Sequence, residues 1–428
     1  MEVYMNNKNV LVVGSGGREH ALCWKLKQSE QIETVYCAPG NDGMKSVATL
    51  VPINFTDVPK LIEFAKELSI DLVVIGQEAA SEAGLADACH AENIAVFGPT
   101  KAAAQIETSK VFSKKLMRNA NIPTATFETF DDTEGARAFA YSRPRPIVIK
   151  ADGLAAGKGV VLAETNAEID EAIDSIMVQK QFGDSGNSVV IEDFLPGQEV
   201  STHAFCDGKT AILFPTSQDH KQIFDGDKGP NTGGMGVIAP VPWVTAEHMK
   251  FTEQRIVLPA LSELKKTQSS FVGTLYPGLM IDKNDVQLLE FNSRFGDPEC
   301  EVYMRLFDGD LYQTLINCTN GELSQSGVSW SEASAATVIL ASANYPQGSR
   351  KGDKISGLAN AESIENVVIF HAATYENDGE FYTNGGRVLA VTATGETLDD
   401  ALKTVYRAVS EIHFDGMQYR TDIGQRVS

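Results

Sequence analysis

Three polar side chains occupy alternating positions at the end of one apolar segment, Leu288 to Arg294. Glu290 supplies a carboxylate, Asn292 an amide oxygen and Arg294 a guanidinium. Side chains two positions apart on a β-strand lie on the same face, so these groups are predicted to point together. Two hard oxygen ligands suit a Mg²⁺ that carries nucleotide phosphates, and the arginine suits an anion beside the metal. Alone, the pattern also fits a surface strand end with a local ion pair.

A glycine-rich segment, Lys150 to Gly159, is the second strong signal. A lysine ends a predicted strand, and glycines at 153, 157 and 159 allow backbone N–H groups to approach an anion. The segment is not a P-loop, because its spacing is one residue short and Gly159 stands where Ser or Thr is required. The following residues, Val160 to Leu162, are β-like. A hairpin that closes over nucleotide phosphates is favoured over a structural turn.

Other loops carry weaker signals. Gly14 to Glu19 resembles a dinucleotide fingerprint but lacks its third glycine, so it argues against NAD while still offering amides to a phosphate. The stretch Val190 to Glu199 could present backbone groups to an adenine edge, although an ordinary acidic strand edge fits as well. The glycine-rich loop Gln218 to Gly236 costs conformational entropy unless a ligand orders it.

The first hundred residues alternate predicted strands and helices, which indicates a doubly wound parallel sheet. Ligands bind such sheets at the carboxyl ends of the strands, so the loops 14–17, 39–41 and 76–78 are expected to line one crevice. One helix is predicted over 101–119, a hairpin around 150–159, and a strand pair at 273–281 and 286–291. The last hundred residues return to strands and end in a helix at 397–413.

Composition excludes several classes of protein. The 428 residues are 43% hydrophobic and 22% charged, with no apolar run near the roughly 18 residues of a membrane span. A formal charge of −21 disfavours nucleic-acid binding. The six cysteines are scattered without a CxxC pair, which argues against a zinc site or a disulfide framework. The sequence predicts a soluble, cytoplasmic protein.

Taken together, the motifs at 14–20, 39–41, 150–159, 229–236, 290–298 and 383–388 resemble the phosphoribosylamine–glycine ligase family of ATP-grasp enzymes, over essentially the whole chain. The resemblance implies an α/β fold with an N-terminal doubly wound domain over residues 1–103 that binds phosphoribosylamine. A central ATP-grasp region would cover 104–330, with a mobile nucleotide lid at about 123–195, and a small α+β domain 331–428. The implied reaction joins glycine to 5-phosphoribosylamine in purine synthesis, through a glycyl phosphate made with ATP.

The resemblance also assigns roles to residues of this sequence. Arg294 and Lys150 would be catalytic, and Glu290 and Asn292 would hold Mg²⁺ or Mn²⁺. The ATP site would comprise Lys110, Lys150, Asp152, Gly153, Gly157, Lys158, Gly159, Glu192, Leu195 and Glu199. The acceptor site would comprise Gly16, Gly40, Asn41, Asp219, His220, Lys221, Asn231, Thr232 and Gly233. Neither nucleic acid nor membrane is an expected partner, whereas transient contact with neighbouring purine-pathway enzymes is.

The sequence departs from the family pattern at Gln77, Gln222 and Glu301, where a proline, a basic residue and a glutamine are usual. Three other functions compete with the ligase: an ATP-grasp enzyme for a different carboxylate or amine, an NAD-linked oxidoreductase, and a catalytically silent nucleotide-binding regulator. The missing third glycine counts against the oxidoreductase. The intact set of Glu290, Asn292 and Arg294 counts against the regulator.

Overall fold

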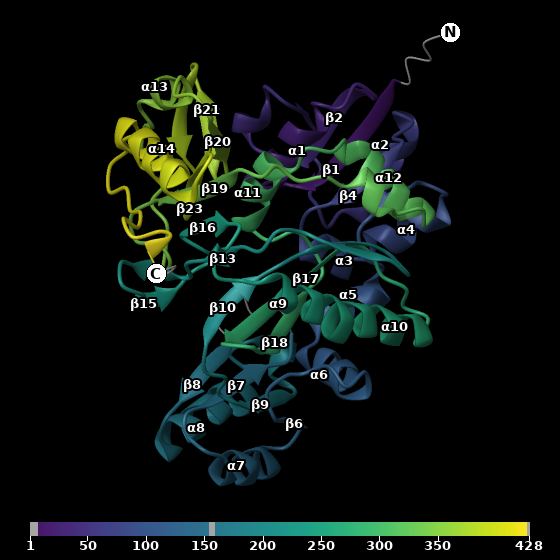
Figure 1. The fold of residues 1–428 in the computed structure, drawn as a ribbon, viewed down its shortest axis with the longest axis vertical. Helices are drawn as coiled ribbons and strands as arrows, with labels where there is room; N and C mark the ends of the chain where they lie inside the picture. The colour runs from purple at the N-terminus through teal and green to yellow at the C-terminus, as the bar shows by residue number, and fades with distance from the viewer. Residues whose placement is uncertain (1–6, 154–158, 426–428) are drawn as a thin grey trace.

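The computed structural model describes residues 7–153 and 159–425. Within these ranges the chain forms three five-stranded sheets, one four-stranded sheet and two separate hairpins. In Figure 1 the N-terminal and C-terminal portions lie side by side at the top, and the four-stranded sheet with its helices lies at the bottom. No helix in the described ranges is long and apolar enough to cross a membrane.

The N-terminal sheet is parallel throughout and confirms the predicted doubly wound arrangement, with strand order β3-β2-β1-β4-β5. Both faces of its central strand are buried: Val10 and Val12 join one core cluster, and Leu11 and Val13 join another. The strands are β1 (Lys8–Gly14), β2 (Ile32–Pro39), β3 (Thr49–Leu50), β4 (Leu72–Ile75) and β5 (Val96–Phe97). The helices are α1 (Gly17–Leu26), η1 (Asp42–Met44), α2 (Val58–Glu67), α3 (Glu78–Glu82) and α4 (Leu85–Ala91).

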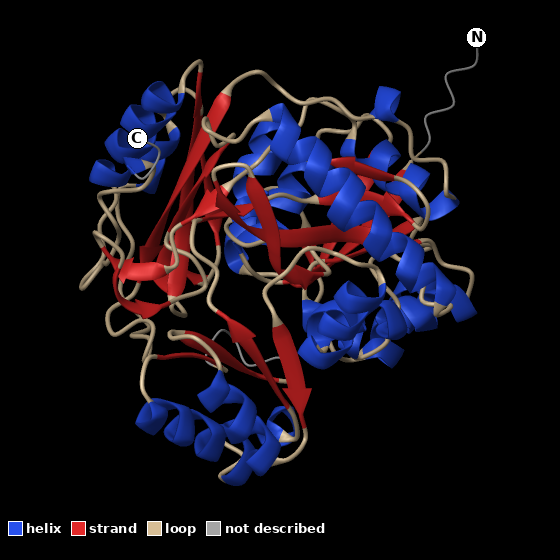
Figure 2. Ribbon diagram, turned by 60° about the horizontal axis from the view of Figure 1, so that its bottom comes forward, coloured by secondary structure: helices blue, strands red, loops and turns tan. Residues whose placement is uncertain are grey.

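The four-stranded sheet at the bottom of Figure 1 is antiparallel, in the order β6-β9-β7-β8. Its strands β7 and β8 form the predicted hairpin, in which Lys150 is opposite Val160. Apolar residues of α7 and α8 pack with those of β7 and β9 in one core, and Figure 2 shows these helices on the outer side of the strands. The elements are β6 (Phe127–Phe130), α7 (Thr133–Ser142), β7 (Ile147–Ala151), β8 (Val160–Ala163), α8 (Asn166–Ile173), η2 (Asp174–Val178), η3 (Gly183–Gly186) and β9 (Val189–Asp193).

The central sheet runs β10-β17-β11-β12, with β18 paired antiparallel to β17 as predicted. The predicted single helix over 101–119 is wrong: Ser109 is extended, with φ −131° and ψ 110°, and its hydroxyl caps a second helix. The elements are α5 (Lys101–Thr108), α6 (Lys110–Asn119), β10 (Gln198–Ser201), β11 (Ala204–Asp207), β12 (Ala211–Leu213), α9 (Ala246–Thr252), η4 (Glu253–Val257), α10 (Leu258–Lys266), β17 (Val272–Asp282) and β18 (Asp285–Asn292).

The C-terminal sheet recruits two strands from the middle of the chain, in the order β13-β16-β19-β23-β20. The segment 218–236 is therefore not a simple loop, since it contributes an edge strand, a hairpin and the start of β16. The elements are β13 (Gln218–Asp219), β14 (Gln222–Phe224), β15 (Lys228–Asn231), β16 (Gly236–Ala239), α11 (Glu299–Leu306), α12 (Leu311–Asn320), η5 (Gln325–Gly327), β19 (Ser334–Ala341), α13 (Leu358–Glu362), β20 (Val367–His371), β21 (Thr374–Asn377), β22 (Glu380–Thr383), β23 (Arg387–Gly395) and α14 (Leu398–Glu411).

An aromatic cluster lies where the N-terminal and central sheets meet. The fully buried ring of Phe205 lies 4.3 Å from Phe214, 5.8 Å from Phe307 and 6.3 Å from both Phe97 and Phe295 between ring centroids. Because Phe295 directly follows Arg294, this cluster fixes the backbone beyond β18.

We expect Phe205→Ala to lower the free energy of unfolding by about 3–5 kcal/mol, because it leaves a cavity within the aromatic cluster. Phe224→Ala, at a side chain that is 55% exposed, should change it by less than about 0.5 kcal/mol. Thermal and urea unfolding of both variants would check this. Equal effects for the two substitutions would contradict a stabilising role for the cluster.

Candidate functional site

Glu290 and Asn292 lie on β18 on either side of the buried Phe291, as the alternation predicts. Burial alone would raise the pKa of the Glu290 carboxyl, but the charges of nearby cations lower that pKa to about 2. The group is therefore ionised at neutral pH. The four cations that act on it are Lys110, Lys150, Lys221 and Arg294.

The oxygen groups of Glu290 and Asn292 fit a divalent cation. The Glu290 carboxylate makes no hydrogen bond or ion pair with any residue in the described ranges. The amide oxygen of Asn292 has one long contact, 3.4 Å from Arg294 Nη2. No cluster of three or more His, Cys, Asp or Glu side chains suited to a metal occurs among the described residues. A cation here would need further oxygens from a ligand, as Mg²⁺ bound to nucleotide phosphates has.

A buried ion-pair triad connects the four-stranded sheet to α6. Lys114 Nζ lies 2.5 Å from Glu192 Oε2, and Lys150 Nζ pairs with Glu192 Oε1. All three side chains are less than 10% exposed. Burial opposes ionisation of Glu192, but the two lysines lower its pKa. The triad places the predicted ATP residues Lys150 and Glu192 together and adds Lys114, which the sequence analysis missed.

A second ion pair, between Lys221 and Glu199, brings a predicted acceptor residue against a predicted ATP residue. Asp152 caps α6, since its Oδ1 accepts hydrogen bonds from Ser109 Oγ at 3.0 Å and from the Val111 amide at 3.1 Å. Lys110 begins that helix. Asp152 therefore orients the helix that carries Lys110 and Lys114.

The glycine loop is described only at its two ends. Gly153 has φ +128°, and a Cβ there would lie 2.3 Å from Ser185 Oγ, so this position requires glycine. The Gly159 carbonyl accepts a 2.9 Å hydrogen bond from the Ala151 amide and closes the hairpin. Gly157 and Lys158 lie outside the described residues. Leu195 is half-buried just beyond β9.

The three N-terminal loops meet as predicted. Gly40 N donates to Gly14 O at 3.0 Å, and Gly76 N donates to Val13 O at 3.0 Å. The Asn41 side chain donates to the carbonyls of Ser15 and His371, each at 2.9 Å, and its oxygen accepts from Gly43 N. Asn41 thus joins the N-terminal loop to the C-terminal sheet.

Gly16 has its amide occupied, because it donates to Glu19 Oε2 at 2.6 Å. A Cβ on Gly16 would lie 3.3 Å from Asp297 Oδ2, which places this loop beside the segment that follows Arg294. Asp297 in turn pairs with Arg387 at 2.7 Å. The N-terminal loop and the C-terminal sheet therefore meet at Asp297.

The segment 219–233 lies on the other side of Arg387. Arg387 Nη1 donates to Gly233 O at 2.5 Å and to Asp297 O at 2.8 Å. Thr232 folds back on Lys221, with both its amide and its hydroxyl donating to the Lys221 carbonyl. Arg387 therefore ties the predicted acceptor loop to the segment after β18, a role that the sequence analysis did not assign.

The remaining predicted acceptor residues differ in their surroundings. Burial and the charge of Glu299 raise the pKa of Asp219 well above its usual range. The His220 ring is fully buried, with Nδ1 3.2 Å from Gly236 O and Nε2 accepting from the Gly424 amide at 3.1 Å. Both ring nitrogens are thus engaged within the protein. Asn231 is exposed at the end of β15.

Two departures from the family pattern have clear positions. Gln77 is the extended residue before α3. Glu301 is fully buried, and a Cβ on Gly17 would lie 2.4 Å from its Oε1. Both of its carboxyl oxygens lack a hydrogen-bond partner among the described residues. Burial and the charge of Asp297 raise the pKa of Glu301 well above its usual range.

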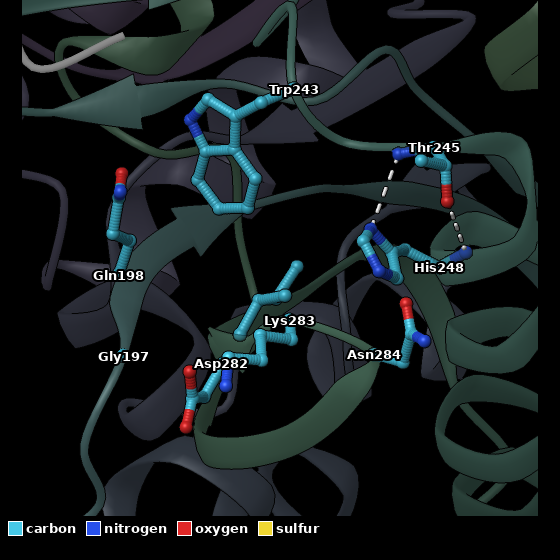
Figure 3. A pocket seen from close by; sticks show the side chains of 9 residues that line it. Gly197, Gln198, Trp243, Thr245, His248, Asp282, Lys283 and Asn284 are labelled. Carbon is cyan, nitrogen blue, oxygen red and sulfur yellow. Dashed lines mark hydrogen bonds between the residues drawn. The ribbon is translucent and has the colours of Figure 1, made fainter. Parts of the chain in front are cut away.

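A surface hollow of about 470 Å³ lies away from these groups (Figure 3). Trp243, His248 and the β17–β18 turn line it, together with Gln198. Successive strand residues face opposite sides of a sheet, so Gln198 faces this hollow and its neighbour Glu199 faces the site. None of the residues predicted for the site lines the hollow.

Comparison with known proteins shows which family this chain is similar to. Residues 8–107, 108–300 and 335–426 match the N, ATP-grasp (A) and C domains of phosphoribosylglycinamide synthetase. The chain is 46% identical over 417 residues to the phosphoribosylamine–glycine ligase of Brucella melitensis, covering 97% of each chain. It is 45% identical over 418 residues to that of Halalkalibacterium halodurans, covering 98% of this chain and 97% of the relative.

Solved structures agree with the sequence comparison. The phosphoribosylamine–glycine ligase of Thermotoga maritima matches with a TM-score of 0.85 and 34% identity, over 97% of this chain and all of that one. A biotin carboxylase from Campylobacter jejuni matches with a TM-score of 0.74 over 97% of this chain and 93% of that one, but at 15% identity it shares the fold alone. The chain therefore belongs to the phosphoribosylglycinamide synthetase family, with its N, ATP-grasp and C domains in the family order.

Proposed function

We propose that this protein ligates glycine to 5-phosphoribosylamine with ATP, giving glycinamide ribonucleotide, ADP and phosphate in the cytoplasm. The observation that carries the proposal is the ionised, otherwise unengaged carboxylate of Glu290 among four cationic side chains. A carboxylate without a protein partner can bind a metal ion, and the cationic side chains around it can bind phosphate oxygens. This combination suits a metal-bound polyphosphate better than a redox cofactor. Family membership supports the choice of substrates.

The proposed reaction has two steps. An oxygen of the glycine carboxylate attacks the γ-phosphorus of ATP, the bond to the β-phosphate oxygen breaks, and ADP leaves. The amine nitrogen of phosphoribosylamine then attacks the carbonyl carbon of glycyl phosphate. Phosphate departs with the oxygen that came from glycine, and the nitrogen loses a proton. No side chain needs to act as a nucleophile, so positioning and electrostatics supply the catalysis.

The side chains of the site have different proposed roles. Lys110 and Lys150 bind phosphate oxygens, while Arg294 stabilises the charge that develops on the transferred group. Glu290 and Asn292 would hold Mg²⁺ or Mn²⁺, which when bound neutralises phosphate charge. Glu192, Leu195 and Glu199 would frame the adenosine, and the hairpin from Asp152 to Gly159, including Gly153, Gly157 and Lys158, would close over the phosphates.

Phosphoribosylamine is proposed to bind between the N-terminal loops and the segment around Arg387. Gly16, Gly40 and Asn41 would form one wall. The other wall would comprise Asp219, His220, Lys221, Asn231, Thr232 and Gly233, with His220 supporting the wall from within. Asn41 and Arg387 position loops from distant parts of the chain, because each contacts more than one of them.

The overall reaction is tested by measuring ADP release with Mg²⁺, ATP, glycine and freshly generated phosphoribosylamine, omitting each component in turn. We expect ADP and glycinamide ribonucleotide in equal amounts, and only in the complete mixture. AMP as the product, or faster turnover with another carboxylate or amine, would contradict the proposal.

Glu290→Gln should lower kcat at least about 100-fold, because it removes an anionic oxygen from the cationic site. The melting temperature should stay near that of the wild type, since Glu290 forms no ion pair with the described residues. Glu380→Gln is the matched control, because Glu380 pairs at the surface with Lys354 and both side chains are about half exposed. Normal kcat in Glu290→Gln would exclude the assigned role.

Lys150→Met should raise the KM for ATP about tenfold or more, the loss expected for one charge-assisted hydrogen bond to phosphate. The aliphatic stem is retained, and Lys114 still pairs with Glu192. Lys209→Met, at an exposed lysine, serves as the control for charge. An unchanged KM for ATP would show that Lys150 serves only to neutralise Glu192.

A further inference from the structure

Two carboxylates from outside β18 hold the Arg294 guanidinium in place. Arg294 Nη2 lies 3.1 Å from Glu107 Oε1, and its Nε lies 3.5 Å from Glu78 Oε2, an ion-pair distance without a hydrogen bond. Burial disfavours the charged form of Arg294, but the charges of Glu107 and Glu78 raise its pKa. The guanidinium is therefore oriented before any substrate binds.

Glu107 is in an unfavourable position unless these contacts hold it there. It lies in the last turn of α5, where the helix dipole repels a negative charge, and its side chain is only 6% exposed. A buried carboxylate at such a place requires several partners. Its Oε2 accepts hydrogen bonds from the Ser293 amide at 2.8 Å and the Ser293 hydroxyl at 2.9 Å, while Oε1 faces Arg294.

The Glu107 carboxylate thus fixes two parts of the site at once. Ser293 is the residue between Asn292 and Arg294, so one oxygen sets the backbone at the end of β18 while the other sets the guanidinium. Residues 8–107 match the N domain of the family and residues 108–300 the ATP-grasp domain. Glu107, the last residue that matches the N domain, therefore contacts residues of the segment that matches the ATP-grasp domain.

We propose that Glu107 is a positioning residue for the ligation, acting through Arg294 and Ser293 rather than by touching a substrate. This inference rests on the proposed function. Nη2 is directed to Glu107 and Nε lies beside Glu78. The Nη1 edge of the guanidinium can therefore face the transferred phosphoryl group. Nη1 donates a long hydrogen bond, 3.4 Å, to the Phe295 carbonyl.

The test is the nearly isosteric variant Glu107→Gln. Its amide oxygen can still accept from Ser293, but its amide NH₂ group opposes the guanidinium. We expect kcat to fall about 100-fold, as a displacement of a catalytic group by about 1 Å does, with KM for ATP within twofold of wild type. Glu92→Gln, which removes the same charge from an exposed pair with Lys66, should leave both constants unchanged.

A double-mutant cycle separates positioning from a merely structural role. If Glu107 acts through Arg294, adding Glu107→Gln to Arg294→Ala should produce no further loss of kcat. Losses that multiply, or a normal kcat in Glu107→Gln, would overturn the inference.

A second variant covers the case in which Glu107→Gln does not fold, as judged from its melting curve. Ser293→Ala removes one hydrogen bond to the same carboxylate and should lower kcat about three- to tenfold with KM for ATP unchanged. An unaltered kcat in folded Ser293→Ala would also count against the inference. Failure of the proposed function would be recognised separately, as absence of glycine-dependent turnover in the wild type.

Discussion

Charged side chains that leave water need partners of opposite sign, because an unpaired buried ion costs several kcal/mol. The candidate site is organised by this constraint. Lys114 and Lys150 share Glu192, Lys221 pairs with Glu199, and Arg294 pairs with Glu107. Once these pairs are formed, the site still surrounds Glu290 with positive charge. A chain with a formal charge of −21 thereby contains a local site suited to polyphosphate.

The same pairs connect parts of the chain that are distant in sequence. The Lys114–Glu192 contact joins α6 to the four-stranded sheet, and Glu107 joins the end of the N domain to the residues that follow β18. Arg387, at the start of β23, holds Gly233 and Asp297, so the C-terminal sheet sets the position of two loops of the site. A shift of the four-stranded sheet relative to α6 would therefore separate Glu192 from Lys114.

Local patterns in the sequence were sufficient for part of the site. The alternation of Glu290 and Asn292 follows from strand geometry, whereas the expected continuation to Arg294 is wrong, because β18 ends at Asn292 and Arg294 lies in the bend that follows. The hairpin at Lys150 follows from glycine spacing between two β-like segments. The N-terminal parallel sheet followed from alternating strands and helices. Each of these signals lies within a few neighbouring residues or repeats along the chain.

The parts that escaped prediction depend on contacts across the chain. Glu107 looks like an ordinary helical glutamate until Ser293, which is 186 positions away and directly follows β18, is placed against it. Lys114 is one of several lysines on α6, and only the fold shows that it is buried. Ser109 did carry a usable signal, because serine is a preferred N-cap residue, and that signal could have divided the predicted helix over 101–119. The recruitment of β13 and β16 into the C-terminal sheet had no local signal.

The central chemical claim is that glycine is activated as an acyl phosphate within this charged site. It is tested most directly with glycine carrying ¹⁸O in both carboxylate oxygens, followed by mass spectrometry of the inorganic phosphate. The account predicts one ¹⁸O in each phosphate released during complete turnover, because the bridging oxygen leaves with phosphorus. Phosphate without ¹⁸O, formed in step with glycinamide ribonucleotide, would contradict it.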